Sequence, residues 1–187
     1  THFNLANVLR TEQDFENALL HYEKATLLKP NFSRALNNLA LLKLHFRDFE
    51  GAKASLEKAN NIVPKNSEVL NNLGLVYLEM GESATAREYF DKAVAIKPNY
   101  LQAINNLGLS YQALGESETA LSLFDRALVI KSDYLEALGN KANALREVGR
   151  LDASIQTIER LLSLEPNNFK ALNNLGLTLK DLSLIHI

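Results

Sequence analysis

Apolar residues follow two helical stripes in every stretch of 34 residues, and residues 67–100 show both most clearly. The first stripe has the spacing of one face of an amphipathic helix and consists of Leu70, Leu73, Gly74 and Tyr77. The second consists of Ala86, Phe90, Ala93 and Ile96. Gly81 lies between the stripes, where a helix C-cap favours a residue without Cβ, and Lys97-Pro98 ends the second helix because proline lacks an amide donor. Each stretch therefore predicts a hairpin of two helices, helix A followed by helix B.

The hairpin pattern repeats with a fixed period along the chain. Residues 101–134 match residues 67–100 at a spacing of 34, and the matched pairs include Asn72/Asn106, Gly74/Gly108 and Phe90/Phe124. Proline recurs at one point of the repeat, at Pro30, Pro64, Pro98 and Pro166. A fixed period of roughly 20–50 residues is typical of solenoids and related repeat proteins. The predicted repeats are residues 1–32, 33–66, 67–100, 101–134 and 135–168, followed by a half repeat at 169–181.

This spacing resembles the tetratricopeptide repeat, whose pattern places a large residue, Leu-Gly, Tyr, Ala, Phe, Ala and Pro along a period of about 34 residues. The resemblance covers residues 1–181 and is carried by many positions in register. It implies an all-α fold, a right-handed solenoid of antiparallel helix hairpins. One position departs from the family pattern: the first large residue, often tryptophan, is here Leu36, Leu70, Ile104, Leu138 and Leu172.

Both ends of the sequence depart from the repeat. Thr1 falls at the third repeat position, so we expect that the N-terminus is cut within a repeat. At the other end, residues 182–187 read LSLIHI in place of a Gly-Glu turn and a second helix, and this hexapeptide resembles a translated transposon end used to tag sequencing libraries. We therefore expect a non-native tail on an open reading frame truncated at both ends. The alternative is a short capping tail.

Asparagine occupies the sixth position of helix A in every copy of the repeat, at Asn4, Asn38, Asn72, Asn106, Asn140 and Asn174. The fifth position adds Asn37, Asn71, Asn105 and Asn173. On a helical wheel the sixth position lies opposite the core stripe, which predicts exposure. Asparagine is a mediocre helix former, so its recurrence on this face indicates a further role. Because the amide carries both donors and an acceptor, it can pair with one peptide unit of a bound chain.

In tetratricopeptide repeats the stacked A helices form the concave wall, and the resemblance therefore places this asparagine ladder in a groove. Neighbouring hairpins pack about 10 Å apart and an extended peptide advances about 3.3 Å per residue, so roughly three ligand residues pass each repeat. The ladder is similar to that in the superhelix of O-GlcNAc transferase. We expect peptide contacts from Asn38, Asn72, Asn106, Asn140, Asn174, Asn71 and Asn105. The alternative is that these amides form hydrogen bonds between repeats.

Leucine recurs at the ninth position of helix A, at the edge of the expected groove, at Leu41, Leu75, Leu109 and Leu177. These leucines either receive apolar side chains of the ligand or pack against the neighbouring helix A. In the second repeat Lys43 replaces the tyrosine of helix A, and we expect its stem to lie over the core with the ammonium group in water.

Charged residues do not support a more specific ligand. Tetratricopeptide domains that clamp C-terminal carboxylates of chaperones need basic residues on their A helices, and the matching positions here include Phe3 and Glu68. We do not predict that clamp, because a free carboxylate would meet little positive charge. On helix B an acid–base pair recurs, at Glu23-Lys24, Glu57-Lys58, Asp91-Lys92, Asp125-Arg126 and Glu159-Arg160. We interpret these pairs as a solvated outer face with some ion pairs between repeats.

Composition argues against several other classes of function. The net charge of −2 favours neither nucleic acid nor an anionic membrane, and no apolar run has the length of a membrane span. The chain has no cysteine, which excludes disulfides and is compatible with a cytoplasmic location. The histidines form no metal-binding motif, and the sequence has neither a phosphate-binding glycine-rich loop nor a nucleophile elbow; they are His2, His21, His45 and His186. We predict no catalytic residue, no cofactor and no small-molecule substrate in this segment.

We therefore predict a protein–protein interaction module that binds an extended peptide segment of a partner protein in its concave groove and is a fragment of a longer protein. An alternative is the substrate-recruiting arm of a glycosyltransferase or sulfotransferase whose catalytic domain lies outside this chain, because the repeats resemble those that precede such domains. A third possibility is a passive spacer or self-association surface, since terminal repeats expose apolar helix faces.

Overall fold

The computed structural model describes residues 1–185, and its regular secondary structure in that range is α-helical throughout. The helices are α1 (His2–Thr11), α2 (Phe15–Leu28), α3 (Ser33–His45), α4 (Phe49–Ile62), α5 (Ser67–Glu79), α6 (Ser83–Ile96), α7 (Leu101–Ala113), α8 (Ser117–Ile130), α9 (Leu135–Glu147), α10 (Leu151–Leu164) and α11 (Phe169–Ile185). Odd-numbered helices are the predicted A helices, and even-numbered helices are the predicted B helices. The all-α fold with a 34-residue period is thereby confirmed.

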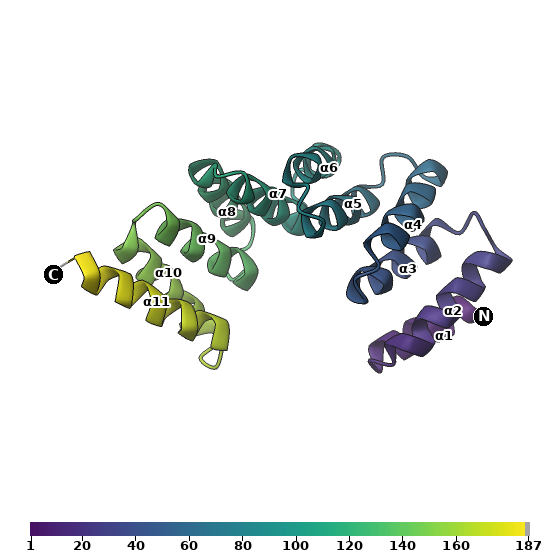
Figure 1. Ribbon diagram of the computed structural model, residues 1–187, viewed down its shortest axis with the longest axis horizontal. Helices are drawn as coiled ribbons and strands as arrows, with labels where there is room; N and C mark the ends of the chain where they lie inside the picture. The colour runs from purple at the N-terminus through teal and green to yellow at the C-terminus, as the bar shows by residue number, and fades with distance from the viewer. Residues whose placement is uncertain (186–187) are drawn as a thin grey trace. The chain divides into compact units, whose positions relative to one another are not determined.

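Contacts between helices group the chain into two compact units. Unit 1 comprises Thr1–Lys97 with helices α1 to α6, and unit 2 begins at Pro98 and comprises α7 to α11. Within each unit every A helix packs against the B helix that follows it, and each B helix packs against the next A helix (Figure 1). The A helices also touch one another within a unit, in the pairs α3·α5, α7·α9 and α9·α11. These A-helix contacts bring the asparagine positions of neighbouring repeats together.

Each hairpin turn is built on a residue in the left-handed backbone region. Gly81 has a φ of 81°, and the amide of the next residue, Glu82, donates to the Tyr77 carbonyl at 2.8 Å. This hydrogen bond closes a Schellman motif at the C-terminal end of α5, as predicted for Gly81. Two hairpins hold non-glycine residues at the same point, Gln13 with a φ of 62° and Arg47 with a φ of 61°. The turn geometry is therefore kept even where the sequence does not favour it.

Replacement of Gly81 by alanine should destabilise unit 1 by about 1 kcal/mol, because an L-residue is strained in the left-handed region. A Cβ at Gly81 meets no atom within 4 Å, so the cost is conformational and not steric. Gly176 lies within helix α11 and has equally open space, and alanine there should stabilise by about 0.5–1 kcal/mol. Urea denaturation of both variants measures the two effects. A loss at Gly176 equal to that at Gly81 would contradict this explanation.

Small residues on helix A and large residues on helix B fit together inside each hairpin. A Cβ on Gly74 would lie 2.5 Å from the Phe90 ring, and a Cβ on Gly108 would lie 2.5 Å from the Phe124 ring. Both phenylalanines have 0% exposure. Where helix A carries alanine at this point, helix B carries another large residue, in the pairs Ala6/Tyr22, Ala40/Leu56 and Ala142/Ile158. Gly74 therefore allows α5 and α6 to approach each other closely.

Helix α11 extends beyond the end predicted for the half repeat. The sequence predicts a half repeat over residues 169–181, and α11 continues beyond it to Ile185 because no proline or glycine interrupts residues 182–185. The last part of the expected tail, residues 186–187, lies outside the described residues.

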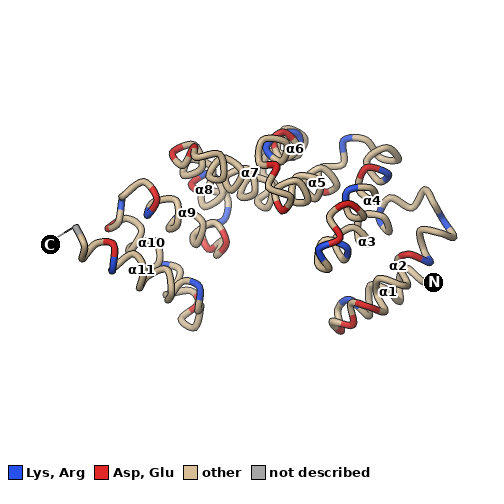
Figure 2. The backbone as a smooth tube through the Cα atoms, viewed as in Figure 1, with Lys and Arg blue, Asp and Glu red and all other residues tan. Residues whose placement is uncertain are grey.

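No helix in residues 1–185 combines the length and apolar character needed to cross a membrane. Acidic and basic residues are interspersed along both units, consistent with the small net charge (Figure 2). Within each unit, binding must therefore be explained by local groups and not by a strong overall field.

Candidate peptide-binding surface

The asparagine ladder lies on the first two turns of the A helices, and its side chains are more buried than a helical wheel predicts. Asn72 and Asn106 are 5% and 8% exposed, and Asn71 and Asn105 are also buried. Three other members are half-buried: Asn38, Asn140 and Asn174. The exposure expected for the sixth position is therefore wrong at Asn72 and Asn106. A helical wheel describes one helix, whereas neighbouring A helices pack against this face of α5 and α7.

Amides of the ladder form hydrogen bonds between successive A helices in both units. In four repeats the sixth-position Nδ2 donates to an asparagine Oδ1 on the preceding A helix: Asn38 to Asn7 at 3.2 Å, Asn72 to Asn37 at 2.8 Å, Asn140 to Asn105 at 2.9 Å, and Asn174 to Asn143 at 2.8 Å. Hydrogen bonding between repeats, one of the two roles considered for the ladder, is thus present. A buried amide without such a partner would be destabilising.

The accepting asparagine lies at the fifth or the ninth position of helix A. Two repeats lack asparagine at the fifth position, where they carry Phe3 and Gly139. In these repeats the acceptor is at the ninth position, Asn7 and Asn143, where the other repeats carry leucine. Sequence reasoning missed Asn7 and Asn143, although comparison of the fifth and ninth positions across the repeats reveals the exchange.

At three members of the ladder the side-chain oxygen remains available to accept a hydrogen bond. Among the described residues, no hydrogen bond reaches the Oδ1 atoms of Asn38, Asn140 and Asn174. Every fully buried side-chain nitrogen or oxygen atom in the described part of the chain has a partner, so these three oxygens contact solvent. Because the Nδ2 side of each amide is held by the preceding helix, the oxygen is a fixed acceptor.

A small polar cleft adjoins the ladder in unit 1, between the first turns of α3 and α5. Its volume is about 140 Å³, and it is lined by Ser33, Arg34, Asn37, Asn38, Asn66, Glu68 and Val69. Asn66 caps α5 by accepting from the Glu68 amide at 3.0 Å, and the Asn37 amide donates to the Glu68 carboxylate at 3.0 Å. The Arg34 guanidinium lies 5.9 Å from the Phe3 ring centre. The cleft therefore offers a cation, an oriented carboxylate and the Asn38 oxygen within one polar space.

The ninth-position leucines differ in their burial from repeat to repeat. Leu109 packs against the hydrophobic cluster formed by α8 and α9, which includes Phe124 and Leu145. Leu41 and Leu75 are half-buried, and Leu177 on α11 is 39% exposed. At Leu109 the structure therefore agrees with packing against neighbouring helices, the second role considered for this position.

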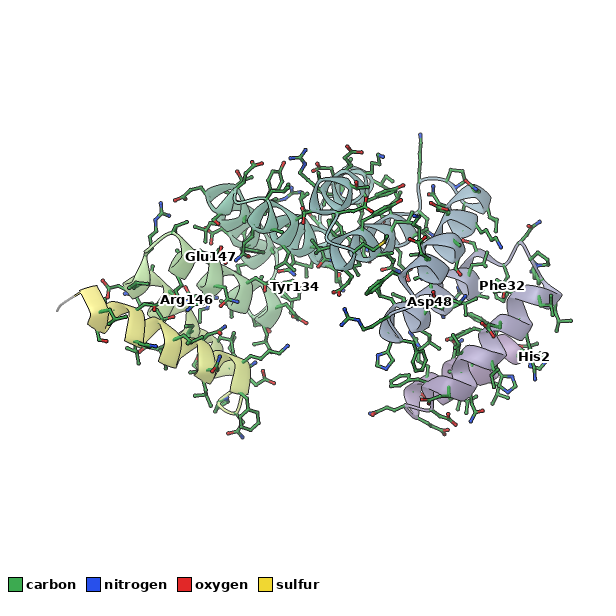
Figure 3. All side chains as sticks on the ribbon, viewed as in Figure 1. His2, Phe32, Asp48, Tyr134, Arg146 and Glu147 are labelled. Carbon is green, nitrogen blue, oxygen red and sulfur yellow. The ribbon has the colours of Figure 1, made fainter. Side chains whose placement is uncertain are left out.

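Tyr134, which is labelled in Figure 3, lies at the N-cap of α9 in unit 2. Burial, together with the nearby Glu136 and Tyr100, raises the pKa of Tyr134 to about 12. Its hydroxyl group is therefore protonated at neutral pH and can donate a hydrogen bond to a carbonyl oxygen.

Histidines and acidic residues do not assemble a group that could hold a metal ion within residues 1–185. No group of three or more potential ligands occurs there. His2 and His21 form a pair with 2.8 Å between their Nδ1 atoms, and the His45 ring lies 4.5 Å from the Phe15 ring. His186 lies outside the described residues. The chemistry that the ladder and the polar cleft offer is hydrogen bonding by amides, by the Glu68 carboxylate and by the Arg34 guanidinium.

Comparison with protein families gives matches along almost the whole chain. Models of the tetratricopeptide repeat match residues 1–32, 33–66, 67–133 and 135–168. No sequence among curated proteins matches significantly.

Solved structures of similar fold include TTC0263, a thermophilic tetratricopeptide protein of Thermus thermophilus, with a TM-score of 0.83 and 21% identity over 95% of this chain and 97% of that chain. PilW, a type IV pilus biogenesis factor, gives a TM-score of 0.84 and 23% identity over 96% of this chain and 88% of that chain. YrrB, a tetratricopeptide protein with an unusual peptide-binding site, gives a TM-score of 0.70 and 22% identity over 92% of this chain and 89% of that chain. At these identities the likenesses show the fold alone.

Proposed function

Because this chain belongs to the tetratricopeptide repeat family of protein-interaction modules, we propose that its A-helix surface binds an extended peptide segment of a partner protein. The observation that carries the proposal is the set of fixed amide oxygens at Asn38, Asn140 and Asn174, which contact solvent. A backbone N–H of the ligand donates to such an oxygen whatever side chain the ligand residue has. The ladder thereby favours an extended chain without demanding a particular sequence.

The cleft beside Asn38 supplies selectivity in unit 1. Arg34 and Glu68 place opposite charges at the cleft, and Asn37 holds the carboxylate in position. A ligand side chain with an acidic or an amide group pairs with Arg34, whereas a backbone N–H or a basic side chain pairs with Glu68. YrrB, whose fold is similar, is itself described as having a peptide-binding site, which supports the class of ligand and not its identity.

The buried members of the ladder support the surface indirectly. Asn72 and Asn71 are bonded to each other and Asn72 also to Asn37, and all three are buried. Removal of these amides would alter packing and binding together. Variants at these residues therefore cannot separate hydrogen bonding between repeats from contact with a peptide. The half-buried Asn38 and Asn140 are better sites for a test, because each keeps its oxygen in contact with solvent.

The double variant Asn38→Ala/Asn140→Ala is expected to bind a selected peptide at least about tenfold more weakly than the wild type, the equivalent of one or two hydrogen bonds. The ligand is obtained by panning a random phage-displayed peptide library against the full chain, and its Kd is measured by fluorescence anisotropy. Asn60→Ala on α4 is the matched control, because the Asn60 amide makes no hydrogen bond with any described residue. An unchanged Kd in the double variant would remove the ladder from the binding mechanism.

A further inference from the structure

A second hollow in unit 1 lies on the opposite side of α3, between the B helices α2 and α4. Its volume is about 930 Å³. We call it the B-helix groove: its floor is Leu36 and Leu39 of α3, and its walls are Leu20 and Leu27 of α2 with Ala54 and Ser55 of α4. Leu20 and Leu27 are 52% and 79% exposed, so one wall presents unusually large apolar side chains to solvent. This groove is separate from the ladder and from the polar cleft.

The groove exists because the second repeat carries small or charged residues where the third repeat carries aromatic ones. Lys43 and Ser55 are equivalent, by the period of 34, to Tyr77 and Tyr89. These two tyrosines stack with 5.3 Å between ring centres and an angle of 9° between ring planes. In the second repeat the Ser55 hydroxyl instead donates to a backbone carbonyl of its own helix, and the space filled by the tyrosine pair in the third repeat remains open.

Positive charge at the groove is neutralised by the protein only in part. Lys43 pairs with Asp48, the N-cap residue of α4, at 3.6 Å (Figure 3). Lys24 and Lys58 also line the groove, and neither ammonium group makes an ion pair or hydrogen bond with any described residue. Among the described residues that line the groove, Glu23 is the one carboxylate. The groove therefore combines an apolar floor with a net positive edge.

In unit 2 the residues at the repeat position of Lys58 form hydrogen bonds within the protein. Arg126 and Arg160 are the equivalents of Lys58 in the fourth and fifth repeats. Arg126 donates to the Pro98 carbonyl at 2.5 Å, and Arg160 donates to the Ser132 carbonyl at 2.7 Å. These bonds fasten helix B to the loop that precedes its hairpin. Among the described residues, lysine at position 58 makes no such bond, which leaves its charge for a partner.

We propose that the B-helix groove binds an acidic amphipathic helix of a partner protein. Apart from the loop residues Pro30 and Asn31, the lining consists of helix surfaces whose backbone groups are paired within the helices. An extended ligand lying along these helices would bury unpaired peptide groups, whereas a helical ligand satisfies its own. From Gly51 to Ile62 the α4 wall spans about 17 Å, or roughly three helical turns. Leucine-like residues at i, i+3, i+4 and i+7 of the ligand occupy the apolar floor, and flanking carboxylates meet Lys24 and Lys58.

The probe for this proposal is a labelled, stapled helical peptide of about three to four turns with that leucine spacing and glutamates on both flanks. Its affinity for the full chain is measured by fluorescence anisotropy, beside a peptide in which lysine replaces every glutamate. We expect the acidic peptide to bind in the micromolar range and the basic peptide to bind at least about tenfold more weakly. Absence of binding by the acidic peptide, or equal binding of the two, overturns the proposal.

Two variants locate the binding. The variant Lys24→Glu/Lys58→Glu should bind the acidic peptide at least about tenfold more weakly than the wild type. The variant Lys92→Glu changes the residue on α6 that is equivalent to Lys58, and it should leave the Kd for this peptide unchanged. Lys43→Tyr/Ser55→Tyr, which copies the third repeat, should fill the groove and abolish binding without lowering the Tm. Wild-type affinity in either double variant overturns the proposal. So does a dimer in sedimentation that the tyrosine variant converts to monomer, because a second copy would then be the occupant.

This site is independent of the proposed ladder. The variant Asn38→Ala/Asn140→Ala should bind the acidic helical peptide as the wild type does, because neither asparagine lines the B-helix groove. Loss of binding in that variant would show that the helical peptide occupies the A-helix surface instead.

Discussion

Replacement of Phe90 by alanine is expected to lower the free energy of unfolding of unit 1 by about 3–5 kcal/mol. The Phe90 side chain is 0% exposed, and its ring lies against the backbone of α5 at Gly74. Glycine has no side chain that can move into the space left by the ring, so the cavity persists. The lost transfer energy and the cavity therefore add, which places this substitution at the upper end of core truncations.

Urea denaturation followed by circular dichroism measures this loss. Phe169→Ala is the matched control, because Phe169 is 83% exposed and its removal should change stability by less than about 0.5 kcal/mol. A further test of the packing uses Gly74→Ala, which places a Cβ 2.5 Å from the Phe90 ring in the wild type but meets open space in Phe90→Ala. A cost below about 1 kcal/mol for Phe90→Ala would contradict the packing described for the hairpin.

Replacement of Asn72 by alanine is expected to cost about 1–3 kcal/mol, although no apolar packing group is lost. The Asn72 Nδ2 donates to the Asn37 oxygen at 2.8 Å, and the Asn72 oxygen accepts from Asn71 at 3.2 Å. All three residues are buried, so the truncation leaves the Asn37 oxygen without its hydrogen-bond donor inside the stack of α3 and α5 and removes one of the hydrogen bonds of Asn71.

A double-mutant cycle with Asn37→Ala isolates the contribution of the pair. We expect the summed losses in the free energy of unfolding of the two single variants to exceed the loss in the double variant by about 0.5 kcal/mol or more. The reason is that the second truncation removes a group that the first has already left without its partner. Asn60→Ala again serves as the control, with an expected change within about 0.5 kcal/mol. Strict additivity at Asn37 and Asn72 would show that the hydrogen bond between repeats does not stabilise the unit.

Most of the fold was predictable because residues that end helices recur at fixed points of the repeat. Gly81 and Lys97-Pro98 mark the ends of α5 and α6, and the fitting of Gly74 against Phe90 follows from a small and a large residue recurring in register. The end of α11 was not predictable from the repeat, because residues 182–185 no longer follow the pattern and contain no helix breaker.

The recurrence of the ladder asparagines was visible in the sequence, whereas their burial and their hydrogen bonds were not. Recurrence singled out Asn38, Asn72 and Asn140, but a periodic pattern on one helix does not show which faces are covered by the neighbouring helix. The partners Asn7 and Asn143 were missed because they depart from the residue that the other repeats carry at the ninth position. Lys43 and Ser55 also depart from the repeat, and these departures leave the B-helix groove open. Departures from a repeat therefore carry structural information that the repeat itself does not contain. The transferase-arm alternative stays a prediction.

In the proposed complex, the amide oxygens of Asn38 and Asn140 contact the backbone of a bound peptide. The test is to record side-chain amide resonances of the isotopically labelled chain during titration with a peptide selected from the phage library. We expect the resonances of Asn38 and Asn140 to shift and to saturate with the peptide, while that of Asn60 does not move. Saturable binding with unmoved Asn38 and Asn140 resonances would contradict the proposal.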